Sequence, residues 1–266
     1  MHCLKKWALL LALAMVVVPG AHAEAGAFGS VEGGVYRFSE SDVDESVFDK
    51  REETQSQPQA QTNEGVPIPT ATLNPQVAEL PWNLILVNRN NPVPDNWEVE
   101  LTTLSNGRQV DSRIVPELTK MFEDCIAAGL KPMVYTAYRT YEDQKDMVAT
   151  KYRQFRNQGL SKKQSQIEAL KLASYPGYSE HQLGLAVDID SSNQAVCSNE
   201  EVWDWMKHHC QEYGFIWRYP SVKTEITGIS NENWHFRYVG VEAATYIMEN
   251  RLSLEEYLNE VYGIPY

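Results

Sequence analysis

Residues 24–79 differ so strongly in composition from the rest of the chain that they limit where a folded domain can lie. The segment holds 11 acidic and three basic residues, a net charge of −8, and much of it is polar and rich in proline and glutamine. Its apolar residues follow neither a helical nor a strand period. Such a segment buries too little apolar surface to offset the entropy lost on ordering. We therefore expect a disordered spacer over residues 24–79 and a folded domain over residues 80–266.

The first 23 residues are typical of a secretory signal peptide. Lys5 and Lys6 precede an apolar run of 12 residues at 7–18, and Ala21 and Ala23 offer small side chains before a cleavage site. The apolar run is shorter than the ~20 residues that a membrane-spanning helix needs. We predict cleavage after Ala23 and a secreted, extracytoplasmic protein that has no membrane span once the signal is removed.

Charge and composition exclude two classes of protein. The chain has 36 acidic and 23 basic residues, a net charge of −13. This balance argues against a protein that mainly binds nucleic acid, because phosphate binding requires Lys and Arg. Hydrophobic residues make up 43% of the chain and aromatic residues 11%. That content is enough to fill a core, so disorder throughout the chain is excluded.

Apolar periodicity within residues 80–266 indicates helices and strands that alternate without a regular βαβ repeat, which predicts an α+β fold. We expect strands at residues 82–88, 133–138, 186–190, 215–218 and 234–239. We expect helices at residues 112–128, 142–157, 161–173, 199–213, 241–250 and 254–261. Ser161 and Gln164 have the spacing of a capping box at the start of one of these helices.

Three cysteines follow the predicted cleavage site: Cys125, Cys197 and Cys210. Cys197 and Cys210 flank the helix expected at 199–213. At 1.5 Å per residue, that helix separates the two by far more than the ~7 Å between Cα atoms that a disulfide tolerates. We therefore do not expect this pair to be bridged.

Two segments combine histidine with carboxylates. His181 lies in a loop with a Pro-Gly turn, and the strand that follows carries Asp188 and Asp190 on one face. His235 lies on another expected strand, three residues after Glu232. Two imidazoles and one carboxylate can hold a catalytic zinc with one position open for water, and a nearby carboxylate can accept a proton. The residues alone leave open the alternative of core histidines and structural aspartates.

Three motifs resemble those of the VanY-type D-alanyl-D-alanine carboxypeptidases, zinc peptidases of bacterial cell-wall metabolism. They span residues 135–144, 176–189 and 232–240 in the family order, and a weaker match covers residues 86–94. The resemblance implies a small antiparallel sheet with flanking helices, as in lysostaphin-type and hedgehog-type zinc domains. Thr136, Ala137 and Asn233 depart from the usual family residues, and none of them is an expected ligand.

The resemblance also implies roles for individual residues. One Zn²⁺ ion would be held by His181, Asp188 and His235. Glu232 would act as the general base. The substrate would contact Arg139, Gln144 and Ser179. Arg139 would act in catalysis as well, on either the developing oxyanion or the terminal carboxylate. Asp190 is expected to support the site rather than to bind the metal.

The function that the resemblance implies is removal of the terminal D-alanine from peptidoglycan stem peptides by a monomeric enzyme. The same scaffold would also suit an L,D-carboxypeptidase or a peptidoglycan endopeptidase. A non-catalytic peptidoglycan-binding domain is a further alternative, which the intact ligand set and Glu232 disfavour. Two histidines and one carboxylate can also hold iron, but Glu232 and the predicted export favour zinc.

Overall fold

The computed structural model describes residues 74–266. The predicted signal peptide and residues 24–73 of the predicted spacer lie outside the described residues. The first described element is the short helix α1 (Pro75–Ala78), whose Val77 is fully buried. Ordered structure is therefore already present before residue 80, where we expected the folded domain to begin.

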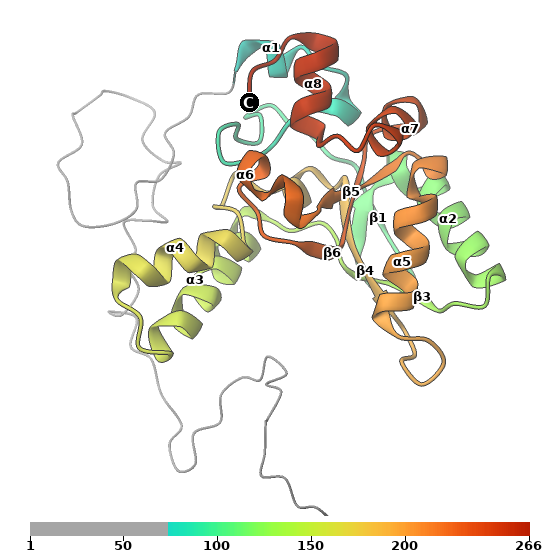
Figure 1. Cartoon of the computed structure of the whole chain (residues 1–266), viewed down its shortest axis with the longest axis horizontal. Coiled ribbons are helices and arrows are strands. Elements are labelled where there is room, and N and C mark those ends of the chain that lie inside the picture. Colours follow the sequence, from blue (N-terminus) through green and yellow to red (C-terminus); the bar gives the residue numbers. More distant parts are fainter. Residues whose placement is uncertain (1–73) are drawn as a thin grey trace, which may run out of the picture. The chain divides into compact units, whose positions relative to one another are not determined.

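A four-stranded antiparallel sheet forms the centre of the described region (Figure 1). Its strands are β3 (Pro132–Thr136), β4 (Ala186–Ser191), β5 (Phe215–Tyr219) and β6 (Glu232–Tyr238), in the spatial order β3-β4-β6-β5. Strands β4 and β6 are the two central ones, and each was expected from the sequence. The predicted α+β class is confirmed, and so is the small antiparallel sheet that the family resemblance implied.

Helices surround this sheet. The longer ones are α2 (Val115–Ala127), α3 (Tyr141–Asn157), α4 (Lys162–Leu172), α5 (Asn199–His209), α7 (Val241–Glu249) and α8 (Leu254–Tyr262). All six were expected within a few residues, and the capping box of Ser161 and Gln164 is present at α4. Helices α2, α5 and α7 contact the sheet, while α3 and α4 pack on each other as a pair beside it (Figure 1).

The remaining helical elements of the described residues are short. The α6 helix (Thr224–Thr227) lies in the connection from β5 to β6. The 3₁₀ turns are η3 (Trp82–Leu84), η4 (Ser112–Ile114), η5 (Glu180–Leu183), η6 (Cys210–Tyr213) and η7 (Ser221–Lys223). The helix expected at 199–213 thus ends as α5 at His209 and continues as the η6 turn.

The strand expected at residues 82–88 is wrong. The segment instead forms the η3 turn, and Ile85, Leu86 and Val87 are buried without entering a strand. Its carbonyl groups find a side-chain donor rather than a neighbouring strand, because Arg237 Nη2 donates to the carbonyls of Asn83 and Ile85 at 3.1 and 2.9 Å. An apolar run whose backbone is satisfied in this way needs no sheet partner.

A second, two-stranded sheet was missed from the sequence. It is the hairpin of β1 (Leu101–Thr103) and β2 (Gln109–Asp111), with Gly107 at φ +82° in its turn. Three-residue strands are too short to give an alternation signal. Within residues 74–266, no helix has both the length and the apolar character needed to cross a membrane.

The hydrophobic core lies against one face of the four-stranded sheet. Val187 and Ile189 on β4 and Phe236 on β6 are fully buried in it, together with helix residues such as Met121, Met206 and Leu258. Because side chains alternate along a strand, the residues between them face the other way. Asp188 and His235 therefore lie on the opposite face.

The three described cysteines are unpaired and buried. The expectation that Cys197 and Cys210 form no disulfide is confirmed.

Candidate active site

Asp188 and His235 lie directly opposite each other on the two central strands. The register pairs them across β4 and β6, and Asp188 Oδ1 is 3.2 Å from His235 Nδ1. Side chains at such paired positions on one sheet face come within contact distance. The topology therefore brings together two residues that are 47 positions apart in the sequence.

His181 reaches the same point from the η5 turn. Its Nδ1 lies 2.8 Å from the carbonyl oxygen of Ala137, which can only accept, so Nδ1 carries the hydrogen. Nε2 is then left as the lone-pair atom, and it lies 3.4 Å from Asp188 Oδ1. The rings of His181 and His235 are perpendicular, with centroids 4.8 Å apart.

These three side chains fit a metal ion. Their ligand atoms all lie within 4.8 Å of one another. Asp188 Oδ1 is buried without a hydrogen-bond partner, although it faces a nitrogen of each histidine. Burial, together with the charge of Arg139, lowers the pKa of His181 to about 4, so this imidazole is already neutral. The pKa of His235 is instead raised to about 9, because hydrogen bonds to Asp188 and Glu180 outweigh burial, so a metal bound there would displace a proton. Asp188 keeps a pKa far below its usual range, because both histidines outweigh its burial.

Glu232 stands beside this group. Its Oε2 lies 3.5 Å from His235 Nδ1, although residues three apart on a regular strand point to opposite faces. The register shift between Trp217 and Tyr219, opposite this part of β6, interrupts the alternation. Burial raises the pKa of Glu232 to about 7, even though the nearby His235 works against that rise. A carboxylate with such a pKa is suited to accept and return protons near neutral pH.

A cavity of about 430 Å³ opens onto these residues and contains most of the predicted site. The residues singled out in the sequence that line it are Arg139, Ser179, His181, Asp188, Glu232 and His235. Asp190 also lines it and accepts a hydrogen bond from Trp203 Nε1 at 3.2 Å, outside the group of possible metal ligands. Trp203 and Trp234 form an aromatic pair on the cavity wall, with ring centroids 5.8 Å apart.

Arg139 is positioned by the segment that carries His181. Its backbone N–H donates to the carbonyl of His181 at 3.2 Å, while its side-chain Nη1 contacts the sulfur of Met147. Its Nε is buried without a hydrogen-bond partner among the described residues. Burial lowers the pKa of this guanidinium, and Asp188 and Glu232 oppose that effect. Arg139 therefore lines the cavity as a cation, while its Nε is closed to solvent.

Gln144 does not reach the cavity. It lies on α3, fully buried, and its Nε2 donates to the carbonyl of Ser174 at 2.6 Å. It thus ties α3 to the chain segment that leads into the η5 turn.

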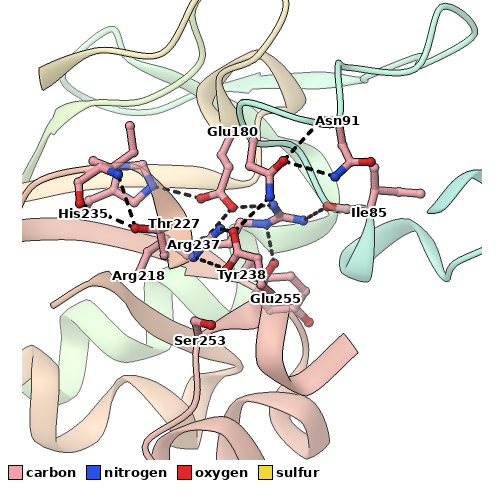
Figure 2. A network of polar contacts seen from close by, with 12 residues as sticks. Ile85, Asn91, Glu180, Arg218, Thr227, His235, Arg237, Tyr238, Ser253 and Glu255 are labelled. Carbon is pink, nitrogen blue, oxygen red and sulfur yellow. Dashed lines mark hydrogen bonds and ion pairs between the residues drawn. The ribbon is translucent and has the colours of Figure 1, made fainter. Parts of the chain in front are cut away.

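Sequence reasoning missed a group of buried ions behind His235 (Figure 2). Glu180 Oε2 lies 3.1 Å from His235 Nε2, and Glu180 Oε1 accepts from Arg218 and Arg237 at 2.9 and 3.1 Å. Arg218 makes two further bonds to Glu255 on α8, at 2.9 and 2.7 Å. Burial alone would raise the pKa of Glu180, but the two arginines hold it well below its usual range. A signal was present for Arg218, which interrupts a strand whose other residues are apolar or aromatic.

Comparison with known proteins gives a consistent result. A family model described as VanY, D-alanyl-D-alanine carboxypeptidase, matches residues 107–241. A D-alanyl-D-alanine carboxypeptidase of Enterococcus faecalis is 48% identical over 189 residues, which is 71% of this chain and 70% of that protein.

Two solved structures are similar to the described fold. One is VanYB in complex with D-alanine-D-alanine, with a TM-score of 0.67 and 48% identity over 68% of this chain and 99% of that one. The other is a VanY mutant from the VanB-type resistance cassette in complex with Zn(II), with a TM-score of 0.66 and 47% identity over 67% and 100% of the two chains. Motifs, fold and site geometry agree, and the chain belongs to the VanY family of D-alanyl-D-alanine carboxypeptidases.

Proposed function

We propose that this protein is a zinc-dependent carboxypeptidase that removes the terminal D-alanine from peptidoglycan stem peptides. One observation carries the proposal: the ligand atoms of His181, Asp188 and His235 converge within 4.8 Å, with Glu232 at their edge. The two similar solved structures support the choice of metal and substrate, since one is a complex with Zn(II) and the other a complex with D-alanine-D-alanine. His181, Asp188 and His235 would hold the zinc ion, which would supply Lewis-acid chemistry by acidifying water and polarising a carbonyl.

The protein's own residues then perform the proton transfers and the charge stabilisation. Glu232 accepts a proton from the attacking water and delivers it to the amine nitrogen of the departing D-alanine. The raised pKa of Glu232 suits both halves of this task. Arg139 lines the cavity and offers its positive charge to an oxygen anion of the substrate, either the developing oxyanion or the terminal carboxylate.

The proposal is tested by measuring D-alanine release from a stem pentapeptide and from the shortened tetrapeptide, with and without a chelator. We expect release from the pentapeptide, none from the tetrapeptide, and loss of activity on metal removal. Preference for the tetrapeptide would establish that the enzyme is an L,D-carboxypeptidase. Cleavage of crosslinked peptides would establish that it is an endopeptidase. Release that survives the chelator would refute the metal mechanism.

Two variants distinguish the contribution of metal binding to activity from that of the general base. Glu232→Gln should abolish release while retaining zinc, whereas His181→Ala should lose both activity and zinc. Glu249→Gln, an exposed position on α7, is the matched control and should change neither. Wild-type activity in Glu232→Gln would show that another group moves the proton.

We also propose that the chain is exported, that it is cleaved after Ala23, and that it acts as a monomer. The proposed catalytic residues all line one cavity of a single chain, so the proposed reaction needs no residue from a second copy. The mass of the protein recovered outside the cytoplasm tests the cleavage, and sedimentation of that mature protein tests the monomer.

A further inference from the structure

His235 has two ring nitrogens, and the structure gives each a different neighbour. Nδ1 faces Asp188 at 3.2 Å and Glu232 at 3.5 Å, on the side of the proposed metal. Nε2 faces away from that point and lies 3.1 Å from Glu180 Oε2. His235 is 3% exposed and Glu180 is 2% exposed, so water does not compete for this contact.

The two oxygens of the Glu180 carboxylate have different partners. Both arginine contacts, Arg218 Nε at 2.9 Å and Arg237 Nη1 at 3.1 Å, fall on Oε1. Oε2 is thereby left to accept from His235 alone among the described residues. Because both guanidinium groups bind Oε1, Oε2 is the oxygen that accepts from His235 Nε2.

The two arginines are themselves fixed from both ends of the folded region (Figure 2). Arg218 makes a two-pronged contact with Glu255 on α8. Arg237 donates to the carbonyl of Asn83 in η3 and to that of Ile85 just after it. All four charged side chains are buried. Glu180 therefore cannot turn away from His235 without breaking several charge-assisted hydrogen bonds.

We propose that Glu180 is a positioning residue that holds the hydrogen of His235 on Nε2, so that the lone pair of Nδ1 points at the metal. An imidazole binds a metal through the nitrogen that carries no hydrogen, and the hydrogen bond at the other nitrogen selects which one this is. Without Glu180, the ring can place its hydrogen on Nδ1 or rotate about its Cβ–Cγ bond. The inference rests on the proposed function only in assuming that a metal binds.

The experiment compares zinc affinity in Glu180→Gln and Glu255→Gln with the wild type, by competition against a chelator of known affinity. Glu180→Gln should bind zinc about 10- to 100-fold more weakly, the usual effect of losing such a partner. Glu255→Gln is the matched control, because it removes a carboxylate from the same ion group without touching His235. With Arg237 still holding Glu180, it should keep its zinc affinity within about threefold.

A second measurement needs no variant to fold. In the zinc-loaded wild type, ¹⁵N-labelled histidine should show His235 protonated at Nε2, with that proton slow to exchange. Metal coordination through Nε2 would overturn the proposal, as would unchanged zinc affinity in Glu180→Gln or equal losses in both variants. Failure of the proposed function is separate: the wild type would then bind zinc as described but release no D-alanine.

Discussion

Replacing Arg218 with methionine tests whether the buried ions behind the site hold the domain together. The substitution removes three charge-assisted hydrogen bonds, one to Glu180 and two to Glu255, with lengths from 2.7 to 2.9 Å. Methionine retains most of the apolar volume, so the main change is the loss of charge. All the side chains involved are inaccessible to solvent.

The cost falls unequally on the two carboxylates that are left behind. Glu180 keeps the donors Arg237 Nη1 and His235 Nε2, whereas Glu255 keeps only Asn88 Nδ2, at 3.1 Å. Breaking a buried ion pair from one side costs about 3–5 kcal/mol, because the other charge is left uncompensated. We expect Arg218→Met to lose about this much free energy of unfolding, most of it through Glu255.

Urea denaturation in the presence of a chelator measures this loss without a contribution from metal binding. If the free energy of unfolding falls by about 2 kcal/mol per molar urea, the urea concentration at the unfolding midpoint should fall by about 1.5–2.5 M. The double variant Arg218→Met/Glu255→Gln should lose about 2 kcal/mol less than the sum of the single losses, because neutralising Glu255 removes the unpaired charge. A loss below about 1 kcal/mol for Arg218→Met, or strictly additive losses, would refute this account of the cluster.

Three further predictions concern other parts of the molecule. Arg139→Lys should retain zinc but lose activity by about 10²–10³-fold, because a point charge replaces a forked donor. A fall confined to kcat would indicate that Arg139 contacts the developing oxyanion. A rise in KM would indicate that it contacts the terminal carboxylate. Glu256→Gln should cost about 1 kcal/mol at neutral pH, because hydrogen bonds from Lys223 and Ser253 outweigh burial and keep the pKa of Glu256 below its usual value. A lowered folded-state pKa stabilises above the unfolded-state pKa, so this difference between urea midpoints should vanish as the pH falls through the folded-state pKa; a constant difference would contradict it. A thiol reagent should label three cysteines in the mature protein after denaturation without reductant and almost none before, since burial raises the thiol pKa of Cys125 and Cys210 to about 12.

The site could be predicted from the sequence where the chemistry sits on regular elements within recognisable motifs. Asp188 and His235 lie on strands with clear apolar alternation, and their convergence followed from the family motifs. Glu232 was expected at the entrance of its strand, but only the irregular pairing opposite β6 explains how it faces the same way as His235.

Contacts that a single side chain makes to a distant segment could not be predicted from the sequence. The segment after residue 82 has the composition of a strand, and nothing local indicates that Arg237 bonds its carbonyls. Gln144 was expected to contact the substrate, and its place in the motif gave no sign that its Nε2 donates to the carbonyl of Ser174. The partners of Glu180 likewise come from two strands and so leave no pattern in its own segment.

The bonds from Arg237 to the carbonyls of Asn83 and Ile85 bear on how small this domain can be made. The family match covers residues 107–241, yet a fragment with those limits would lack both these acceptors and the Glu255 carboxylate. Arg237 would then lose two acceptors and Arg218 its two bonds to Glu255, within the ion group that contacts His235. We therefore expect the smallest autonomous folding unit to extend on both sides of residues 107–241.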